Sequence, residues 1–396
     1  MQASATAPLL LVGFQRDVRP ALRVLARPVH VLVARGRRVP DVPELAGVRE
    51  IDLHGPTQPI ADEARDLLAG ERPAAIVAMA ERTVLVAARL RQTFGLPGND
   101  AEVALRCADK LEMKRAMGAG GVPVAPWREL RRDSDASELI EALGLPIVVK
   151  PRRDSGGRGQ RRFDDQRSLA QALEQLAGEG AFENGYGWLA EGWLDGVEMS
   201  IEAFVHSGLP RFQNPTEYYV SKHANILPAQ LDAAQWRALR EFDARALAAA
   251  GVERGVTHLE LFRTPAGPIF GELAIRPPGG RLMALLRSAW GFDPWEALLR
   301  LELGEIVGFP TAPRRVAGVW ILHPGNGHVR AIRGLEDVRA LPHVRRVALK
   351  VRQGESIAER QGTGQDVGAL YADGPDRDTV AAALTRAHRR LQIELS

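Results

Sequence analysis

Two alternating strands near the middle of the chain bring two glutamates to facing positions. Residues 256–276 read VTHLELFRTPAGPIFGELAIR, and if residues 265–267 form the turn, Glu260 lies directly opposite Glu272. Like charges that face each other across a hairpin destabilise it unless something positive lies between them. Carboxylate oxygens on a rigid sheet beside phosphate are ligands that Mg²⁺ uses. The segment therefore predicts a hairpin that holds a metal-bound nucleotide; the alternative is that the two acids pair with surface arginines.

Further polar residues accompany the two glutamates. Arg276 follows on the return strand, and the turn after it contains Gly279 and Gly280, a combination that favours an anion-binding site. His258 shares the face of Glu260 and either contacts a substrate or packs. The alternation predicts that these residues lie on the faces of the two glutamates: His258, Phe262, Phe270, Ala274 and Arg276.

The composition limits the class of protein. The 396 residues suffice for two or three domains, and 45% apolar with 26% charged residues indicates a globular fold. The net charge of +3 comes from arginines scattered among acids, so no nucleic-acid partner is expected. The single cysteine, Cys107, excludes an intramolecular disulfide and is expected to be an inert buried thiol. The amino-terminal sequence has no basic leader and too short an apolar run for a membrane span, so we expect no membrane partner and a cytoplasmic protein.

The first 105 residues alternate short apolar runs with stretches that suit helices. Such strand–helix alternation predicts a doubly wound parallel sheet. No G-x-G-x-x-G sequence follows the first run, so dinucleotide binding is not supported there. The predicted strands are residues 9–14, 30–34, 49–53 and 74–79.

A glycine-rich turn lies between the predicted strands 146–151 and 160–163, with Lys150 at the end of the first strand. Glycines let backbone N–H groups approach phosphate oxygens and a lysine adds positive charge, so the pattern predicts a flexible flap over phosphates. Because a strand follows the glycines, this is not a Walker loop, and an ordinary glycine-rich turn is the alternative. The residues of interest in the turn are Ser155, Gly156, Gly157 and Gly159.

Two weaker signals lie on either side of this flap. Lys110 and Lys114 are four residues apart on one face of a predicted helix, where a solvated face is the simpler interpretation. After the flap, an extended connector offers backbone groups to a base edge, an apolar wall and a carboxylate for ribose hydroxyls. The residues concerned are Glu191, Trp193, Leu194 and, on the next strand, Glu198.

From about residue 311 the chain has the pattern of a separate, small α+β unit. Segments 318–324 and 328–332 are predicted to pair as a hairpin around the turn 325–327. The other elements expected there are strands at 343–351 and 368–374 and a closing helix at 378–393.

Taken in order, these motifs resemble those of the ATP-grasp superfamily. The matching pieces are DKLEMK, PIVVKP with SGGRG, AEGWLDGVEMS, HLELF and GELAIRPPGG, together with LPGND nearer the amino terminus. The resemblance implies an α/β and α+β fold, with a pre-ATP-grasp doubly wound parallel-sheet domain, a two-lobed ATP-grasp domain and a small C-terminal α+β domain. The implied boundaries are 1–105, 106–310 and 311–396, with a flap lobe at about 126–188 and a metal-site lobe at about 189–310.

The resemblance also implies roles in nucleotide binding. Lys110 and Lys150 would bind ATP phosphates, and the loop 155–159 would close over them. Residues 191–194 would hold adenine, with Glu198 on the ribose.

The metal site carries over in the same way. Glu260 and Glu272 would ligate Mg²⁺, or Mn²⁺ in its place, so that Glu272 and Arg276 would be the catalytic residues. Arg276 would steady an acyl phosphate or the substrate carboxylate. Ala274 departs from the family pattern, because many members have a ligating asparagine there, and the number of metal ions stays open.

Within the superfamily the chain most resembles the L-amino acid (dipeptide) ligases and other carboxylate–amine ligases. This implies that the enzyme forms an amide or peptide bond from a small carboxylate and an amine, through an acyl phosphate. The alternatives are a biotin-carboxylase-like or purine-pathway enzyme, and a non-catalytic nucleotide-binding module. The sequence does not identify the substrates or the general base, and a homodimer is only a prior expectation. Candidate substrate contacts are His258, Tyr218, His223, Asn225, Gly279 and Gly280.

Overall fold

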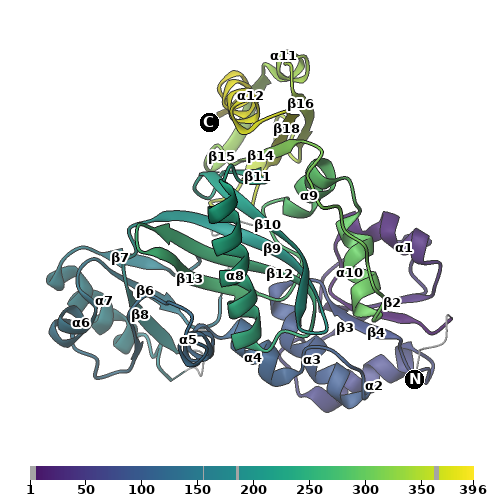
Figure 1. The fold of residues 1–396 in the computed structure, drawn as a ribbon, viewed down its shortest axis with the longest axis horizontal. Helices are drawn as coiled ribbons and strands as arrows, with labels where there is room; N and C mark the ends of the chain where they lie inside the picture. The colour runs from purple at the N-terminus through teal and green to yellow at the C-terminus, as the bar shows by residue number, and fades with distance from the viewer. Residues whose placement is uncertain (1–5, 155, 184–186, 361–364) are drawn as a thin grey trace.

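The computed structural model describes residues 6–154, 156–183, 187–360 and 365–396. A central sheet is surrounded by the N-terminal unit, by a small lobe that carries α6 and α7, and by the C-terminal unit (Figure 1). In the described part of the chain, no helix is both long enough and apolar enough to cross a membrane.

The N-terminal unit contains a four-stranded parallel sheet in the order β3-β2-β1-β4, as the alternation predicts. Leu10 and Val12 face a core shared with α2 and α3, whereas Leu9 and Leu11 face a core shared with α1 and α10. Helices thus cover both faces of this sheet, and α10 comes from a distant part of the sequence. The elements are β1 (Leu9–Val12), η1 (Arg16–Val18), α1 (Arg19–Leu25), β2 (Val29–Ala34), β3 (Gly47–Ile51), α2 (Thr57–Leu67), β4 (Ala75–Ala78), η2 (Glu81–Thr83), α3 (Val84–Thr93), α4 (Ala101–Ala108) and α10 (Pro294–Glu302).

The central sheet has the strand order β13-β12-β9-β10-β11-β14-β18-β16. Its apolar face, with Ile201 and Leu259, packs against Phe242 of α8. The alternate positions of β9 and β12 form a polar face that includes Glu202 and Glu260. Because β11 pairs with β14, the sheet continues across residue 311, and the C-terminal unit shares it rather than forming the separate unit expected. The elements are β9 (Val197–His206), β10 (Leu209–Val220), β11 (Ala224–Leu227), α8 (Ala233–Ala250), β12 (Arg254–Thr264), β13 (Gly267–Ala274), α9 (Leu282–Trp290), β14 (Val316–Leu322), β16 (Val344–Leu349) and β18 (Gly368–Gly374).

The predicted hairpin is formed by β12 and β13, and Glu260 does pair with Glu272. The turn is one residue shorter than predicted, because Thr264 already pairs with Gly267. A bulge at Gly271 adds one residue to the return strand and so brings the two glutamates opposite each other.

The same bulge changes the face of one predicted residue. Phe270 pairs with Leu261 on the apolar face of the sheet and is completely buried. The prediction that Phe270 shares a face with Glu272 is therefore wrong, because one extra residue between them shifts the alternation by one position.

The small lobe is built on an antiparallel sheet in the order β5-β8-β6-β7, whose apolar core includes residues of α6 and α7. β6 and β7 pair on either side of the glycine-rich turn, as predicted. β8 belongs to this sheet, so the sheet extends to Gly192, beyond the expected limit of the flap lobe near residue 188. The elements are α5 (Lys110–Ala119), β5 (Trp127–Leu130), α6 (Ala136–Leu143), β6 (Ile147–Pro151), β7 (Arg161–Phe163), α7 (Gln166–Gly178) and β8 (Trp188–Gly192).

In the C-terminal unit the predicted hairpin of segments 318–324 and 328–332 is wrong. β14 pairs with β11 on one edge and β18 on the other, which leaves no edge for β15. β15 pairs instead with β17 and β19. The closing helix also ends earlier than predicted, because Leu391 is extended and begins the path into β19. The elements are β15 (Gly327–Arg333), α11 (Leu335–Arg339), β17 (Ser356–Ile357), α12 (Arg377–Arg390) and β19 (Gln392–Leu395).

Candidate active site

Glu260 and Glu272 face each other on the hairpin, with 38% and 28% of their side chains exposed. Lys110 Nζ lies 3.5 Å from Glu272 Oε1 and donates a 2.6 Å hydrogen bond to the carbonyl of Asp154. Burial raises the pKa of the Glu272 carboxyl; Lys110 opposes the rise and Glu260 adds to it. Burial also acts to raise the pKa of Glu260, but the hydrogen bond and charge of His258, together with the charges of Arg276 and Lys110, outweigh it and the pKa is lowered. The hairpin therefore presents two accessible carboxylates whose charge is only partly balanced.

These carboxylates fit a magnesium ion that is bound together with phosphates. Proteins commonly hold Mg²⁺ with one or two carboxylates, and phosphate oxygens and water complete its coordination. Among the described residues, no group of three or more His, Cys, Asp or Glu side chains could hold a metal ion. Ala274, which has no ligating atom in its side chain, lies opposite His258 on the hairpin. Two carboxylates suit an ion whose other ligands come from a nucleotide. The assignment of Glu260 and Glu272 as metal ligands stays a prediction.

The carboxylate of Glu191 lies between two lysine ammonium groups. Its Oε2 is 2.8 Å from Lys150 Nζ, and its Oε1 is 3.1 Å from Lys114 Nζ. Burial opposes the charge on Lys150, but Glu191, together with Glu272 and Glu260, outweighs it and raises the pKa of Lys150. Burial likewise opposes the charge on Glu191, and the two lysines together lower its pKa.

Lys114 is not on a solvated face, so the simpler interpretation of the lysine pair is wrong. Lys114 is only 2% exposed, because α5 turns this position toward β8, and burial lowers its pKa. The charged cluster of Lys114, Lys150 and Glu191 is therefore a buried feature. The expected contact of the Glu191 segment with adenine stays a prediction.

The glycine-rich turn has a backbone that requires glycine. Gly156, Gly157 and Gly159 have φ angles of +70°, +71° and +69°, in the left-handed region. A Cβ at Gly157 would meet nothing within 4 Å, so backbone conformation rather than space excludes other residues there. Ser155, which was predicted to belong to this loop, lies outside the described residues.

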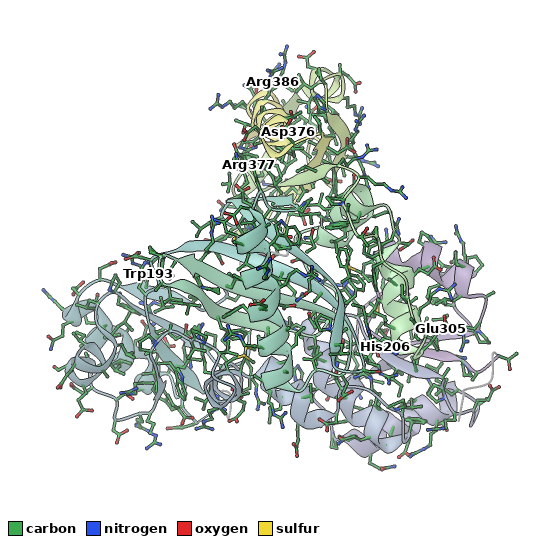
Figure 2. The ribbon with its side chains drawn as sticks, in the orientation of Figure 1. Trp193, His206, Glu305, Asp376, Arg377 and Arg386 are labelled. Carbon is green, nitrogen blue, oxygen red and sulfur yellow. The ribbon has the colours of Figure 1, made fainter. Side chains whose placement is uncertain are left out.

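The connector after β8 lies at the border between the small lobe and the central sheet, where Figure 2 labels Trp193. Trp193 is 39% exposed, and its Nε1 donates a 2.9 Å hydrogen bond to Asp195. The guanidinium of Arg162 lies 4.2 Å from the centre of the indole ring. Leu194 is half-buried. Glu198, on the polar face of β9, has a pKa that is raised by burial and then by a neighbouring carboxylate.

Arg276 is held by a residue of the N-terminal unit. Its Nε donates a 2.8 Å hydrogen bond to Glu81 Oε2, and its Nη1 donates to the carbonyl of Pro277 at 3.0 Å. Glu81 begins the short helix η2, just after the parallel strand β4. The sequence interpretation missed Glu81, although its place was a usable signal, because functional side chains gather beyond the carboxyl ends of parallel strands.

A buried carboxylate beside the hairpin was also missed. Glu202 is 0% exposed and accepts hydrogen bonds from Ser200 at 2.7 Å, from Asn214 at 3.2 Å and from Thr216. His258 Nδ1 lies 2.9 Å from Glu202 Oε1. Burial opposes protonation of His258, but the hydrogen bonds and charges of Glu202 and Glu260 together outweigh it and raise the pKa of His258 to about 9. The alternation of polar residues along β9 was the signal in the sequence.

Two candidate substrate contacts lie together with Glu260, one of the two predicted metal ligands. His258 Nε2 is 3.4 Å from Glu260 Oε1 and 3.4 Å from the hydroxyl of Tyr218. The same hydroxyl is 3.5 Å from Glu260 Oε1. These three side chains form a continuous polar group on one face of the sheet.

The other candidate contacts fall into two places. Asn225 Nδ2 lies 3.5 Å from the carbonyl of Gly280, and a Cβ at Gly279 would meet nothing within 4 Å, so the turn is open. His223 lies apart from this turn: its Nδ1 is 3.4 Å from a guanidinium nitrogen of Arg360, and it lines a cavity of about 230 Å³ in the C-terminal unit. The predicted contact of these residues with a substrate stays a prediction.

Two known families match parts of the chain. The ATP-grasp domain matches residues 143–283, which include the flap and the hairpin. The L-amino acid ligase C-terminal domain 2 matches residues 319–396, most of the C-terminal unit. The chain therefore contains an ATP-grasp domain, followed by a segment that matches the C-terminal domain of L-amino acid ligases.

Individual proteins agree with this assignment. An L-arginine-specific L-amino acid ligase from Bacillus subtilis is 25% identical over 311 residues, covering 75% of this chain and 74% of the relative. The crystal structure of an L-amino acid ligase from Bacillus licheniformis has a TM-score of 0.85 at 20% identity, over 100% of both chains. An N5-carboxyaminoimidazole ribonucleotide synthetase from Thermotoga maritima has a TM-score of 0.76 at 16% identity, over 99% of this chain and 100% of its own. The predicted fold class and the predicted resemblance are confirmed.

Proposed function

We propose that this protein is an ATP-dependent carboxylate–amine ligase that joins two amino acids. One observation carries the proposal: Glu260 and Glu272 oppose each other beside Lys110, in a chain that has both an ATP-grasp domain and the C-terminal domain of L-amino acid ligases. A pair of open carboxylates next to buried lysines suits a metal-bound nucleotide.

ATP supplies the phosphoryl group that activates the substrate carboxylate, with a divalent ion balancing its charge. Lys110 and Lys150 would offset the phosphate charge, while Glu260 and Glu272 would hold the ion. A carboxylate oxygen attacks the γ-phosphorus and ADP leaves; an amine nitrogen then attacks the acyl carbon, phosphate leaves, and the amine loses a proton. Arg276, oriented by Glu81, would stabilise the negative charge on the activated group.

The flap has a defined part in this reaction. Its left-handed glycines allow backbone N–H groups to lie against phosphate oxygens. Closing it over the nucleotide would exclude water, which otherwise hydrolyses an acyl phosphate. Positioning and electrostatics therefore account for the chemistry, and no covalent enzyme intermediate is required.

The alternatives share this fold but not all of these features. The similarity to a purine-pathway synthetase supports the fold alone, whereas the match over residues 319–396 is to the L-amino acid ligase domain. That match favours ligation over bicarbonate-dependent carboxylation. The intact set of Lys150, Glu260, Glu272 and Arg276 favours an enzyme over a non-catalytic module.

The test is the release of ADP from ATP and Mg²⁺ across a panel of amino acids, singly and in pairs, with products identified by mass spectrometry. We expect release that depends on an amino acid and a product with the mass of a dipeptide. Release that requires bicarbonate would favour the carboxylase-like alternative. No release with any pair would favour the non-catalytic alternative. Repeating the assay with Mn²⁺ in place of Mg²⁺ tests the choice of ion.

Two further expectations accompany this proposal. A cytoplasmic location is proposed because ATP is abundant there. A homodimer stays a prediction, to be tested by the molar mass in solution.

A further inference from the structure

The turn after Arg276 has a backbone that needs support. Gly280 and Arg281 have φ angles of +58° and +62°, so two successive residues are in the left-handed region. Glycine adopts this region readily, whereas arginine is strained there unless its surroundings hold it. The Arg281 carbonyl accepts a 3.0 Å hydrogen bond from the N–H of Ala284, so this conformation also sets the start of α9.

The support for Arg281 comes from the C-terminal unit. Arg281 Nη2 donates to both carboxylate oxygens of Asp366, at 3.1 and 3.2 Å. Asp366 is 85 positions away in the sequence, its side chain is only 8% exposed, and Lys350 Nζ lies 2.8 Å from its Oδ1. The Arg281 side chain is 30% exposed, so its pair with Asp366 is partly shielded from water, and partly buried pairs are weakened less by dissolved salt than exposed ones. Asp366 is therefore a fixed anchor for the strained residue of the turn.

We propose that Asp366 is a positioning residue: through Arg281 it holds the Gly279–Gly280 turn in the conformation that receives the substrate carboxylate. This inference rests on the proposed function. The open space at Gly279 gives a ligand access to the backbone of the turn, and the guanidinium of the nearby Arg276 favours an anion there. The C-terminal unit thus shapes the site without contacting the substrate.

Hydrogen exchange of the turn tests the anchor directly. Asp373 provides a matched control, because it lies in the same unit, is also 8% exposed and also pairs with two cations, Arg315 and Arg345. Its hydrogen bond to α9 comes from Ser288, away from the start of that helix. We expect Asp366→Asn to speed exchange of the amides in 279–285 by about tenfold and Asp373→Asn to leave them unchanged. Unchanged exchange in Asp366→Asn would overturn the inference.

Steady-state kinetics test the consequence for the substrate. Asp366→Asn should raise KM for the amino acid by about 5- to 20-fold and leave KM for ATP within about twofold. Because Asp366 acts through Arg281, adding Arg281→Gln should cause no further rise. An equal rise for both substrates, or the same rise in Asp373→Asn, would show a merely structural role and refute the inference. A wild-type protein that releases no ADP with any amino acid would refute the proposed function, and the exchange experiment would still decide the anchor.

Discussion

The same face of the central sheet holds two groups of carboxylates in opposite states. Glu260 and Glu272 are partly exposed, and the nearest lysine is 3.5 Å from Glu272. Glu202, on the neighbouring strand β9, is completely buried and has hydrogen-bond donors on both oxygens. Glu272 lies on β13, the edge strand of the sheet, whereas Glu202 lies on β9, which is paired with β12 and β10.

The comparison separates binding from positioning. A carboxylate with incomplete neutralisation attracts a cation, so Glu260 and Glu272 have a capacity to bind. A buried carboxylate whose oxygens all have hydrogen-bond partners has no capacity left to bind a cation, so it can only orient its neighbours. In this protein Glu202 orients His258, which in turn lies against Glu260.

The largest effect is expected on the rate of ADP formation, from a substitution in the partly exposed pair of Glu260 and Glu272. Glu272→Gln removes charge from the proposed metal site without changing volume, so ADP formation should fall by about 10³-fold or more. The fold should be retained, because burial already disfavours the charged form of Glu272. ADP release and circular dichroism measure the two quantities. The exposed substitution Glu336→Gln in α11 is the control, and near-normal turnover in Glu272→Gln would remove the metal assignment.

At the buried carboxylate, Glu202, we expect a substitution to reduce stability. Glu202→Gln removes the closer of the two carboxylates beside the buried imidazolium of His258, and the free energy of unfolding should fall by about 3 kcal/mol. Urea unfolding followed by fluorescence measures this. If Glu202→Gln were as stable as the wild type while Glu272→Gln unfolded, the distinction between the two groups would be reversed.

Lys150 and Lys114 extend the comparison between binding and positioning from carboxylates to lysines. Lys150→Ala should weaken ATP binding by about 30-fold, because it removes a charge that we propose faces the phosphates. Lys114→Met should change ATP affinity by less than about threefold. The buried ammonium group of Lys114 only neutralises the charge of Glu191. Isothermal titration calorimetry with a nonhydrolysable nucleotide distinguishes them. Equal losses in both variants would contradict separate roles.

The smallest effect concerns a buried acid away from the site. Burial raises the pKa of Asp243 to about 7, and Gln213 donates one hydrogen bond to it. The folded state therefore holds its proton more tightly than the unfolded state, and Asp243 makes the protein less stable as pH rises from about 4 through 7. Asp243→Asn should match the wild type near pH 4 and exceed its unfolding free energy at pH 8, where the wild type must ionise a buried carboxyl group. Thermal unfolding at both pH values measures the difference, and parallel pH profiles would contradict the raised pKa.

The sequence predicted the site best where local rules apply. A period of two along a strand brought Glu260 opposite Glu272, although a shorter turn and the bulge at Gly271 produced the register instead of the predicted turn. The same bulge made the prediction for Phe270 wrong. A bulge depends on how the strand packs on both faces, and neither face is known from a single strand.

Local sequence rules did not predict contacts between residues that are far apart in the sequence. The ion pair of Arg276 with Glu81 joins residues 195 positions apart, and Lys114 looked solvated until β8 covered it with Glu191. The predicted hairpin of the C-terminal unit failed because β11, from another region, occupies one edge of β14. Pairing between strands is decided by competition among all edges of a sheet, which short segments do not reveal.

The amino-acid sequence alone determined which residue types lie at which local spacing: the opposed glutamates, the glycines that accept left-handed torsions, and the order of motifs that indicated an ATP-grasp protein. Only the tertiary structure decided which charges are buried, which are open, and which distant residues hold them, as Glu202 holds His258 and Asp366 holds Arg281. The reason is that local torsions depend on neighbours along the chain, whereas burial and charge balance depend on neighbours in space.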